Sequence, residues 1–311
     1  MPNTESGSQY QQFEIPTYYD QPALKPTHYG WMVSGYIFVA GVAGSAQIIA
    51  TVAEMTDGGM NTRIVRNGRY IALGGAVVGA GLLIADLHTP TRFYNMLRIF
   101  RPTSPMSIGS YVLTTFGAFS ALLAAAQLRR DLGAEPGILD RAAWIAQIPA
   151  ALTGAAISTY TGPLLAATST PLWAALPKLL PAVFGASAMA SAAAALLLTT
   201  PGGAEREPLR RIELVASTVE IAILVLIPTK LRIEGVRTTI GIGPVLAAAC
   251  VPLIEYGAQT VAGRASRAPR FGTLAAAAVL GGAFLLRHLV LQSGNRSAKR
   301  PRDHFRFSWP R

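Results

Sequence analysis

The chain has 311 residues, of which 51% are hydrophobic and only 14% are charged, and its mean hydropathy is positive. Soluble domains carry about 25% charged residues, so this composition excludes a disordered chain and disfavours an ordinary soluble domain. The net charge of +11 would suit a nucleic-acid-binding protein, but the basic residues stand in short clusters between apolar runs. We therefore expect no nucleic-acid partner, and predict a membrane protein whose basic loops lie at the lipid headgroups.

The single cysteine, Cys250, limits the chemistry available to the chain. One thiol forms no disulfide within the chain and is too few for a cysteine-ligated iron–sulfur cluster or a cysteine-rich zinc site. The first 28 residues are polar and show neither the basic start nor the apolar run of a cleavable signal peptide. We expect no metal in this chain.

Eight apolar stretches follow one another, and each is long enough for a helix that crosses about 30 Å of hydrocarbon. A spanning segment has to satisfy its own backbone hydrogen bonds, and these stretches do not alternate as the strands of a membrane β-barrel do. The expected fold is all-α, a polytopic integral membrane bundle of about eight helices in residues 30–291, between a polar segment, 1–29, and a basic tail, 292–311. The stretches are residues 30–53, 70–88, 108–128, 142–166, 174–198, 212–229, 240–260 and 271–291.

Glycine, alanine and serine are frequent in these stretches, as Gly75 and Gly79 illustrate in the second. Small residues let membrane helices approach closely, so they favour one compact bundle, for which a four-plus-four arrangement is one solution. With eight spans both termini lie on one side of the membrane. Basic residues are about equally numerous on the two sides, so the positive-inside rule gives no orientation.

Ionisable side chains at membrane depth are costly, and each is therefore a functional hypothesis. Four stand out: Asp86 near the end of the second stretch, Glu220 in the sixth, Glu255 in the seventh and Arg287 in the eighth. For Asp86 and Arg287 a structural ion pair or an end-of-helix charge is an equally good interpretation. Glu220 lies deeper and is a candidate for a proton or quinone role.

The loop between the second and third stretches is rich in polar, aromatic and basic side chains. Proline favours the first turn of a helix, so Pro105 predicts that the third helix begins there. The loop is either a plain aromatic–basic anchor at the headgroups or a docking surface for a partner protein. The candidate docking residues are Arg92, Phe93, Arg98, Arg101, Pro105 and Met106.

This loop resembles the signature of the NrfD/polysulfide-reductase membrane-subunit family, in which an Asp-Leu-x-x-Pro-x-Arg-Phe element, here beginning at Asp86, precedes a Ser-Pro-Met-Ser-x-Gly element, here ending at Gly109. Tyr160 begins a Tyr-Thr-Gly sequence that resembles the family's fourth-helix motif. The segment 282–294 resembles its last helix, which carries an arginine. The resemblance covers nearly the whole chain. One departure is His88-Thr, where a Gly-Arg pair is common in the family.

The resemblance implies a multi-pass subunit of the inner (cytoplasmic) membrane, inactive alone, in a complex of anaerobic respiration. It implies that the subunit binds quinone or quinol, either menaquinone or ubiquinone, beside a ferredoxin-like iron–sulfur partner. A molybdopterin enzyme or a cytochrome would be a further subunit. No haem is expected in this chain, although His88 and His288 lie at span ends on one face, where a single haem is conceivable.

The resemblance implies a role for one residue, and residue type and position in the chain indicate roles for five others. Tyr160 matches the family's tyrosine that hydrogen-bonds a quinone carbonyl. Asp86 and His88 are placed to relay protons near it, because histidine titrates close to neutral pH. Glu220, Glu255 and Arg287 would form a second proton path across the bilayer.

Two other functions remain open from the sequence. A passive anchor that only tethers soluble subunits would tolerate replacement of Tyr160, Asp86 and Glu220. A secondary transporter would also contain intramembrane charges and broken helices, and Gly162-Pro163 is a candidate break.

Overall fold

The computed structural model describes residues 24–56, 62–87, 89–200, 205–261, 269–300 and 303, without the side chains of 255, 258–261 and 269–271. Within them the chain is helical and has no strand, which confirms the predicted all-α class. Eight long helices follow the eight predicted stretches in order: α1 (Trp31–Thr56), α2 (Thr62–Ala85), α4 (Pro105–Asp131), α5 (Ile138–Thr159), α8 (Leu179–Thr199), α9 (Arg206–Ile233), α10 (Gly243–Val261) and α11 (Pro269–Ala298).

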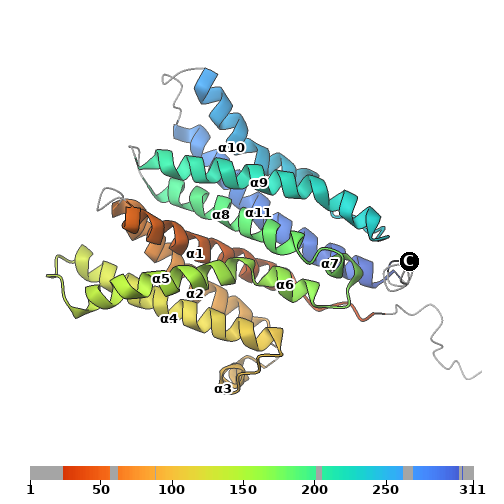
Figure 1. Cartoon of the computed structure of the whole chain (residues 1–311), viewed down its shortest axis with the longest axis horizontal. Coiled ribbons are helices and arrows are strands. Elements are labelled where there is room, and N and C mark those ends of the chain that lie inside the picture. Colours follow the sequence, from red (N-terminus) through yellow and green to blue (C-terminus); the bar gives the residue numbers. More distant parts are fainter. Residues whose placement is uncertain are drawn as a thin grey trace, which may run out of the picture.

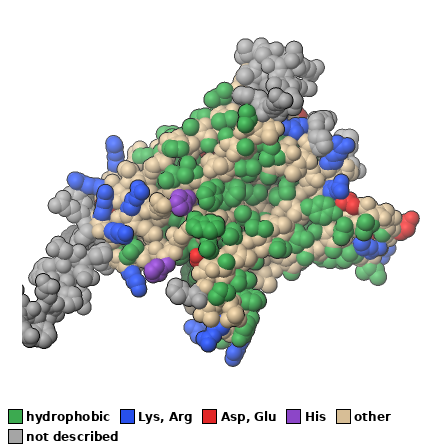
Figure 2. Space-filling model, turned by 180° about the vertical axis from the view of Figure 1, so that it is seen from behind, with side chains coloured by type: hydrophobic (Ala, Val, Ile, Leu, Met, Phe, Trp, Pro, Cys, Tyr) green, Lys and Arg blue, Asp and Glu red, His purple; other side chains and the backbone are tan. Residues whose placement is uncertain are grey.

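Six of these helices, all except α5 and α10, are long and apolar enough to cross a membrane. Helix α10 contains a shorter apolar part, Gly243–Ile254. Hydrophobic side chains form a band across the molecule between two ends that carry the Lys and Arg side chains (Figure 2). The protein is therefore a multi-pass membrane protein.

The helices form two groups of four that meet along α1 and α8 (Figure 1). Helices α1, α2, α4 and α5 pack together, and α8, α9, α10 and α11 form the second group. Helix α8 is rich in alanine and largely enclosed, with Leu180, Val183 and Phe184 fully buried. This is the four-plus-four arrangement that the small residues allow.

Both termini lie at one end of the bundle, which we call the terminal face. The Thr27 N–H and hydroxyl donate to Asn295 Oδ1 at 3.0 and 2.6 Å, and Asn295 Nδ2 donates back to the Thr27 carbonyl at 3.1 Å. The segment before α1 is thereby fixed to the end of α11. The short helices η1 (Pro90–Arg92), α3 (Asn95–Arg98), α6 (Thr161–Ala166) and α7 (Pro171–Ala174) also lie at this end (Figure 1).

The helix boundaries follow from local sequence. Helix α4 begins at Pro105, as predicted, and the Ser104 hydroxyl caps it by accepting the Ser107 N–H at 3.4 Å. Gly133 and Gly235 follow the ends of α4 and α9 with φ angles of 75° and 76°. This left-handed conformation is nearly free of strain for glycine only, and it stops a helix.

The fourth predicted stretch, 142–166, is divided at Tyr160 rather than forming one continuous helix. Helix α5 ends at Thr159 and α6 begins at Thr161. Pro163 explains the division, because it has no N–H for the Thr159 carbonyl and its ring crowds that oxygen. The fifth predicted stretch, 174–198, is also not one continuous helix, because α7 ends at Ala174 and a turn separates it from α8.

The C-terminal boundary also differs from the expected one. Helix α11 continues past Leu291 to Ala298, so that the start of the expected basic tail is helical and packed. Gly294 explains the close packing, because a Cβ there would lie 2.0 Å from the ring of Trp173 in α7. Beyond α11, Asp303 accepts the Arg237 and Thr238 N–H groups, each at 3.2 Å, and so fixes the chain to the α9–α10 loop.

Candidate quinone site at the terminal face

Tyr160 lies at the break between α5 and α6 and points at the first turn of α4. Its hydroxyl donates to the Pro105 carbonyl, and a Cβ on Gly109 would lie only 2.6 Å from the phenol ring. Gly109 is therefore needed for the tyrosine to reach this position. The two sequence motifs, around residues 104–109 and 160–163, meet in space although about 50 residues separate them in the sequence.

Tyr29 joins this group from the segment before α1. It lies close enough to Tyr160 and to Asp86 to interact electrostatically with both. Its ring packs near the buried Trp173, with a centroid separation of 6.1 Å, and the neighbouring Thr27 is fixed to α11. Burial raises the pKa of the Tyr29 phenol above its ordinary value, and the Asp86 carboxylate raises it further. Tyr29 therefore keeps its proton and can donate a hydrogen bond.

Asp86 directly follows α2 and is exposed at the terminal face. Three segments that are distant in the sequence thus bring Tyr29, Asp86 and Tyr160 together. His88, expected beside Asp86, lies outside the described residues. Sequence analysis overlooked Tyr29, because it belongs to no motif and precedes the first apolar stretch. The only available signal was a tyrosine at headgroup depth, which is common in membrane proteins.

An apolar groove of about 360 Å³ lies between α2 and α4. Leu83 and Leu87 line it on one side and Leu113 on the other, while Phe93 and Met96 of the loop cover its end. Leu87, the residue after Asp86, is part of the lining, which contains almost no polar surface. It can hold a hydrocarbon tail whose polar head lies at the terminal face.

The loop between α2 and α4 is held in place by α4. The Tyr111 hydroxyl donates to the Leu97 carbonyl at 2.9 Å, the Arg101 N–H donates to Ser107 Oγ at 3.0 Å, and Phe100 packs edge-on against Tyr111. Helix α3 consequently projects from the bundle (Figure 1). The candidate docking side chains of Arg92, Phe93, Arg98, Arg101, Pro105 and Met106 are all exposed, so each is available to a partner or to headgroups.

A second polar cluster lies inside the helical group formed by α8, α9 and α11. The Arg287 guanidinium is fully buried and donates to Ser187 Oγ at 3.1 Å and to the Ala283 carbonyl at 2.7 Å. Ser187 in turn bonds the buried Glu220 carboxyl. The rings of Phe38 and Phe184 stand 5.9 and 5.6 Å from the guanidinium carbon. Glu220 and Arg287, predicted to share a path, are thus joined through Ser187.

The cluster contains buried donors that no side chain satisfies. Among the described residues, Arg287 Nε and Ser217 Oγ have no hydrogen-bond partner. Buried polar atoms of this kind are usually satisfied by internal water. The side chain of Glu255, the third member of the predicted path, lies outside the described residues; its backbone belongs to α10.

The chain was compared with known families and proteins. A family model described as polysulphide reductase, NrfD, matches residues 22–296. The matched range includes Tyr29, Asp86, Tyr160, Glu220 and Arg287. No curated protein matches the sequence. Among the described residues no group of three or more His, Cys, Asp or Glu side chains is arranged to hold a metal ion.

Proposed function

The chain belongs to the polysulphide reductase, NrfD, family, and on this premise we propose that it is the quinone- or quinol-reactive membrane subunit of a multi-subunit oxidoreductase. Members of this family are membrane subunits of quinone-interacting oxidoreductase complexes. The observation that carries the proposal is the position of Tyr29, close to both Asp86 and Tyr160 at the terminal face, together with the apolar α2–α4 groove that Leu87, the neighbour of Asp86, lines. The groove would hold the isoprenoid tail, and the three side chains would face the ring.

The chemistry assigned to these side chains follows from their protonation. Reduction of a quinone to a quinol consumes two electrons and two protons. Tyr29 can donate a hydrogen bond to a quinone carbonyl, and Tyr160 would do the same when its hydroxyl turns from the Pro105 carbonyl to the ring, so that the two would hold the ring in one orientation. Asp86 is exposed and can exchange protons with water, so it would pass them between the terminal face and the ring. His88 would assist Asp86 in this exchange.

Electrons would come from, or go to, an iron–sulfur partner that docks on the terminal face. The described basic residues there outnumber the acidic ones, and Glu234 and Asp303 are already bound to Lys230 and to the α9–α10 loop. An acidic partner surface is therefore favoured electrostatically. A molybdopterin subunit or a cytochrome would complete the complex, and the inner membrane would be its location. The basic residues concerned are Lys25, Arg92, Arg98, Arg101, Lys178, Lys230, Arg232, Arg237, Arg296, Lys299 and Arg300.

The Glu220–Ser187–Arg287 cluster would serve as part of a second proton path. Its buried donors without a hydrogen-bond partner favour the presence of internal water molecules. Proton relays inside membrane proteins are usually formed by water molecules and carboxyl groups. Glu255 would extend this path along α10. The cluster would otherwise be a purely structural pair, and the double variant Glu220→Met/Arg287→Met separates the two roles.

Replacing Tyr160 with phenylalanine is expected to lower quinol-linked turnover by up to about tenfold, the factor for one lost hydrogen bond of about 1.4 kcal/mol. Asp86→Asn is expected to have a similar effect, because the amide exchanges no proton. The measurement is quinol oxidation or quinone reduction by the purified complex, with bound quinone extracted and counted. Tyr70→Phe, the same change at the opposite end of the bundle, is the control.

A second pair of variants tests the position of Tyr160 without changing its hydroxyl. Gly109→Ala should displace the phenol and reduce turnover, whereas Gly81→Ala, whose Cβ would meet nothing within 4 Å, should not. If Tyr160→Phe, Asp86→Asn and Gly109→Ala all keep full activity in an assembled complex, the chain is a passive anchor. A protein that purifies without quinone or a partner would favour a transporter.

Reversing the charge of Arg98 is expected to lower recovery of the iron–sulfur partner at least about tenfold, because a like-charge contact at an interface costs more than about 1.4 kcal/mol. The measurement is iron per mole of affinity-purified protein for Arg98→Glu. Arg141→Glu, an exposed arginine at the opposite end of the bundle, is the matched control. If Arg98→Glu and Arg141→Glu retain equal iron, the loop acts only as a headgroup anchor.

A further inference from the structure

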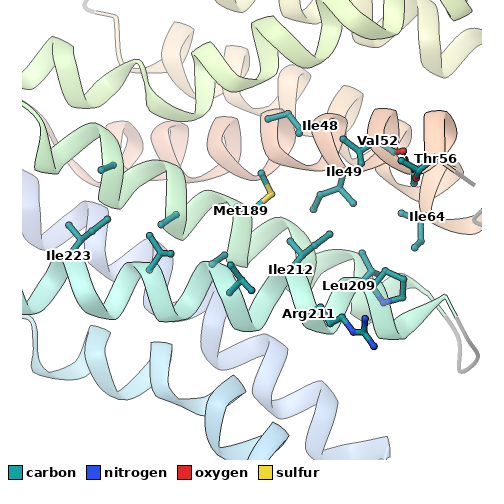
Figure 3. A pocket seen from close by; sticks show the side chains of 17 residues that line it. Ile48, Ile49, Val52, Thr56, Ile64, Met189, Leu209, Arg211, Ile212 and Ile223 are labelled. Carbon is teal, nitrogen blue, oxygen red and sulfur yellow. Dashed lines mark hydrogen bonds between the residues drawn. The ribbon is translucent and has the colours of Figure 1, made fainter.

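A second apolar groove lies away from the proposed quinone site, on the seam where the two four-helix groups meet. It is a cavity of about 690 Å³ between α1, α2, α8 and α9 (Figure 3). Ile49 and Val52 of α1 face Leu209 and Ile212 of α9 across it, and Met189 of α8 forms part of its floor (Figure 3). Its described lining residues are almost all apolar and include no tyrosine or histidine.

Small residues on α8 create the groove and leave it open to the membrane. Ala182 and Ala186 line it where larger side chains would fill the space. Val52 and Val215 on its borders are 53% and 62% exposed, so the groove opens to the lipid rather than to the bundle interior. A hydrocarbon chain can therefore enter it from the side.

The groove has one charged end. Arg211 lies beside Leu209 at the end farthest from Ile223, near the start of α9 (Figure 3). Its Nε–H contacts Glu207 at 3.0 Å, which leaves other N–H donors of the planar guanidinium for an oxygen ligand. Arg63, next to the groove residue Ile64, is also exposed at this end. Arginine binds phosphate oxygens in two-pronged geometry.

The length of the groove fits a lipid of one leaflet. Twelve residues separate Arg211 from Ile223 along α9, which is about 18 Å at about 1.5 Å per residue. One half of a hydrocarbon core of about 30 Å is about 15 Å. A chain whose headgroup lies at Arg211 would therefore reach the middle of the bilayer within the groove.

From the apolar lining, the single cationic end and this length, we propose that the seam groove binds one acyl chain of an anionic phospholipid, with its phosphate at Arg211. The lipid would fill the space between the two helical groups at their contact and so stabilise their relative position. This site is independent of the quinone reaction proposed above.

The test uses the purified complex in nanodiscs of phosphatidylglycerol and phosphatidylcholine at a ratio of 1:3, followed by detergent release and native mass spectrometry. Wild type is expected to retain one phosphatidylglycerol. Arg211→Gln is expected to lower the preference for phosphatidylglycerol about fivefold, the factor for one arginine near an anionic headgroup. Ala186→Trp, which fills the groove, is expected to abolish retention of the lipid.

Two matched controls complete the test. Arg141→Gln removes an exposed arginine at the same end of the bundle, and Ala125→Trp adds the same indole to an exposed position of α4 outside the groove. Both are expected to behave as wild type. Equal retention of phosphatidylglycerol in all variants would overturn the proposal. An equal loss of preference in Arg141→Gln and Arg211→Gln would also overturn it. The same holds if the molecule that Ala186→Trp displaces is a quinone or a neutral lipid.

Discussion

Arg287→Met is expected to destabilise the protein by about 3–5 kcal/mol, the loss typical when one partner of a buried charge pair is removed. The Glu220 carboxyl would then remain buried without the guanidinium that Ser187 links to it. The measurement is the midpoint of thermal unfolding in mild detergent. Lys178→Met, which removes an exposed charge just before α8, is expected to leave the midpoint unchanged.

The double variant Glu220→Met/Arg287→Met decides what the cluster does. Replacing both charges by apolar side chains of similar size is often nearly neutral, so most of the lost stability should return. If the stable double variant still shows slow quinol turnover, the cluster is a proton path. Turnover at the wild-type rate would assign it a structural role. If the stability losses of the two single variants simply add in the double variant, Glu220 and Arg287 are not energetically coupled.

Gly44→Ala is expected to destabilise the bundle by about 1–3 kcal/mol or more, the range for an overpacked core. A Cβ on Gly44 would lie 2.3 Å from the Gly154 carbonyl oxygen and 2.6 Å from Ser158 Oγ, so α1 and α5 would have to separate. Because the nearest atom belongs to the backbone, no side-chain rotation relieves the contact. Thermal unfolding and the monodisperse fraction in gel filtration measure the effect.

Gly74→Ala is the matched control for this substitution. It makes the same change within α2, where a Cβ would meet nothing within 4 Å. This variant should be as stable as wild type or slightly more stable, because alanine is the better helix former by about 1 kcal/mol. Equal unfolding midpoints for Gly44→Ala and Gly74→Ala would show that α1 and α5 are not in close contact.

The sequence by itself determined the fold class and the number of long helices. Hydropathy over about 20 residues is a local property, and an apolar stretch that does not alternate as a barrel strand does can satisfy its backbone in a membrane only as a helix. The start of α4 at Pro105 was predictable for the same reason, since helix caps depend on a few adjacent residues. The match of residues 22–296 to the NrfD family likewise confirms the predicted family, because its motifs are short and contiguous.

Only the tertiary structure decided which of the singled-out residues meet. Tyr160 reaches the Pro105 carbonyl because Pro163 divides the fourth stretch and Gly109 leaves room for the phenol. Tyr29 joins them because Asn295, far along the chain, fixes the preceding segment. Helix packing brings together residues separated by tens to hundreds of positions, and it depends on the fit of small residues between helices rather than on hydropathy. The proposed quinone site and the seam groove both arise from that fit.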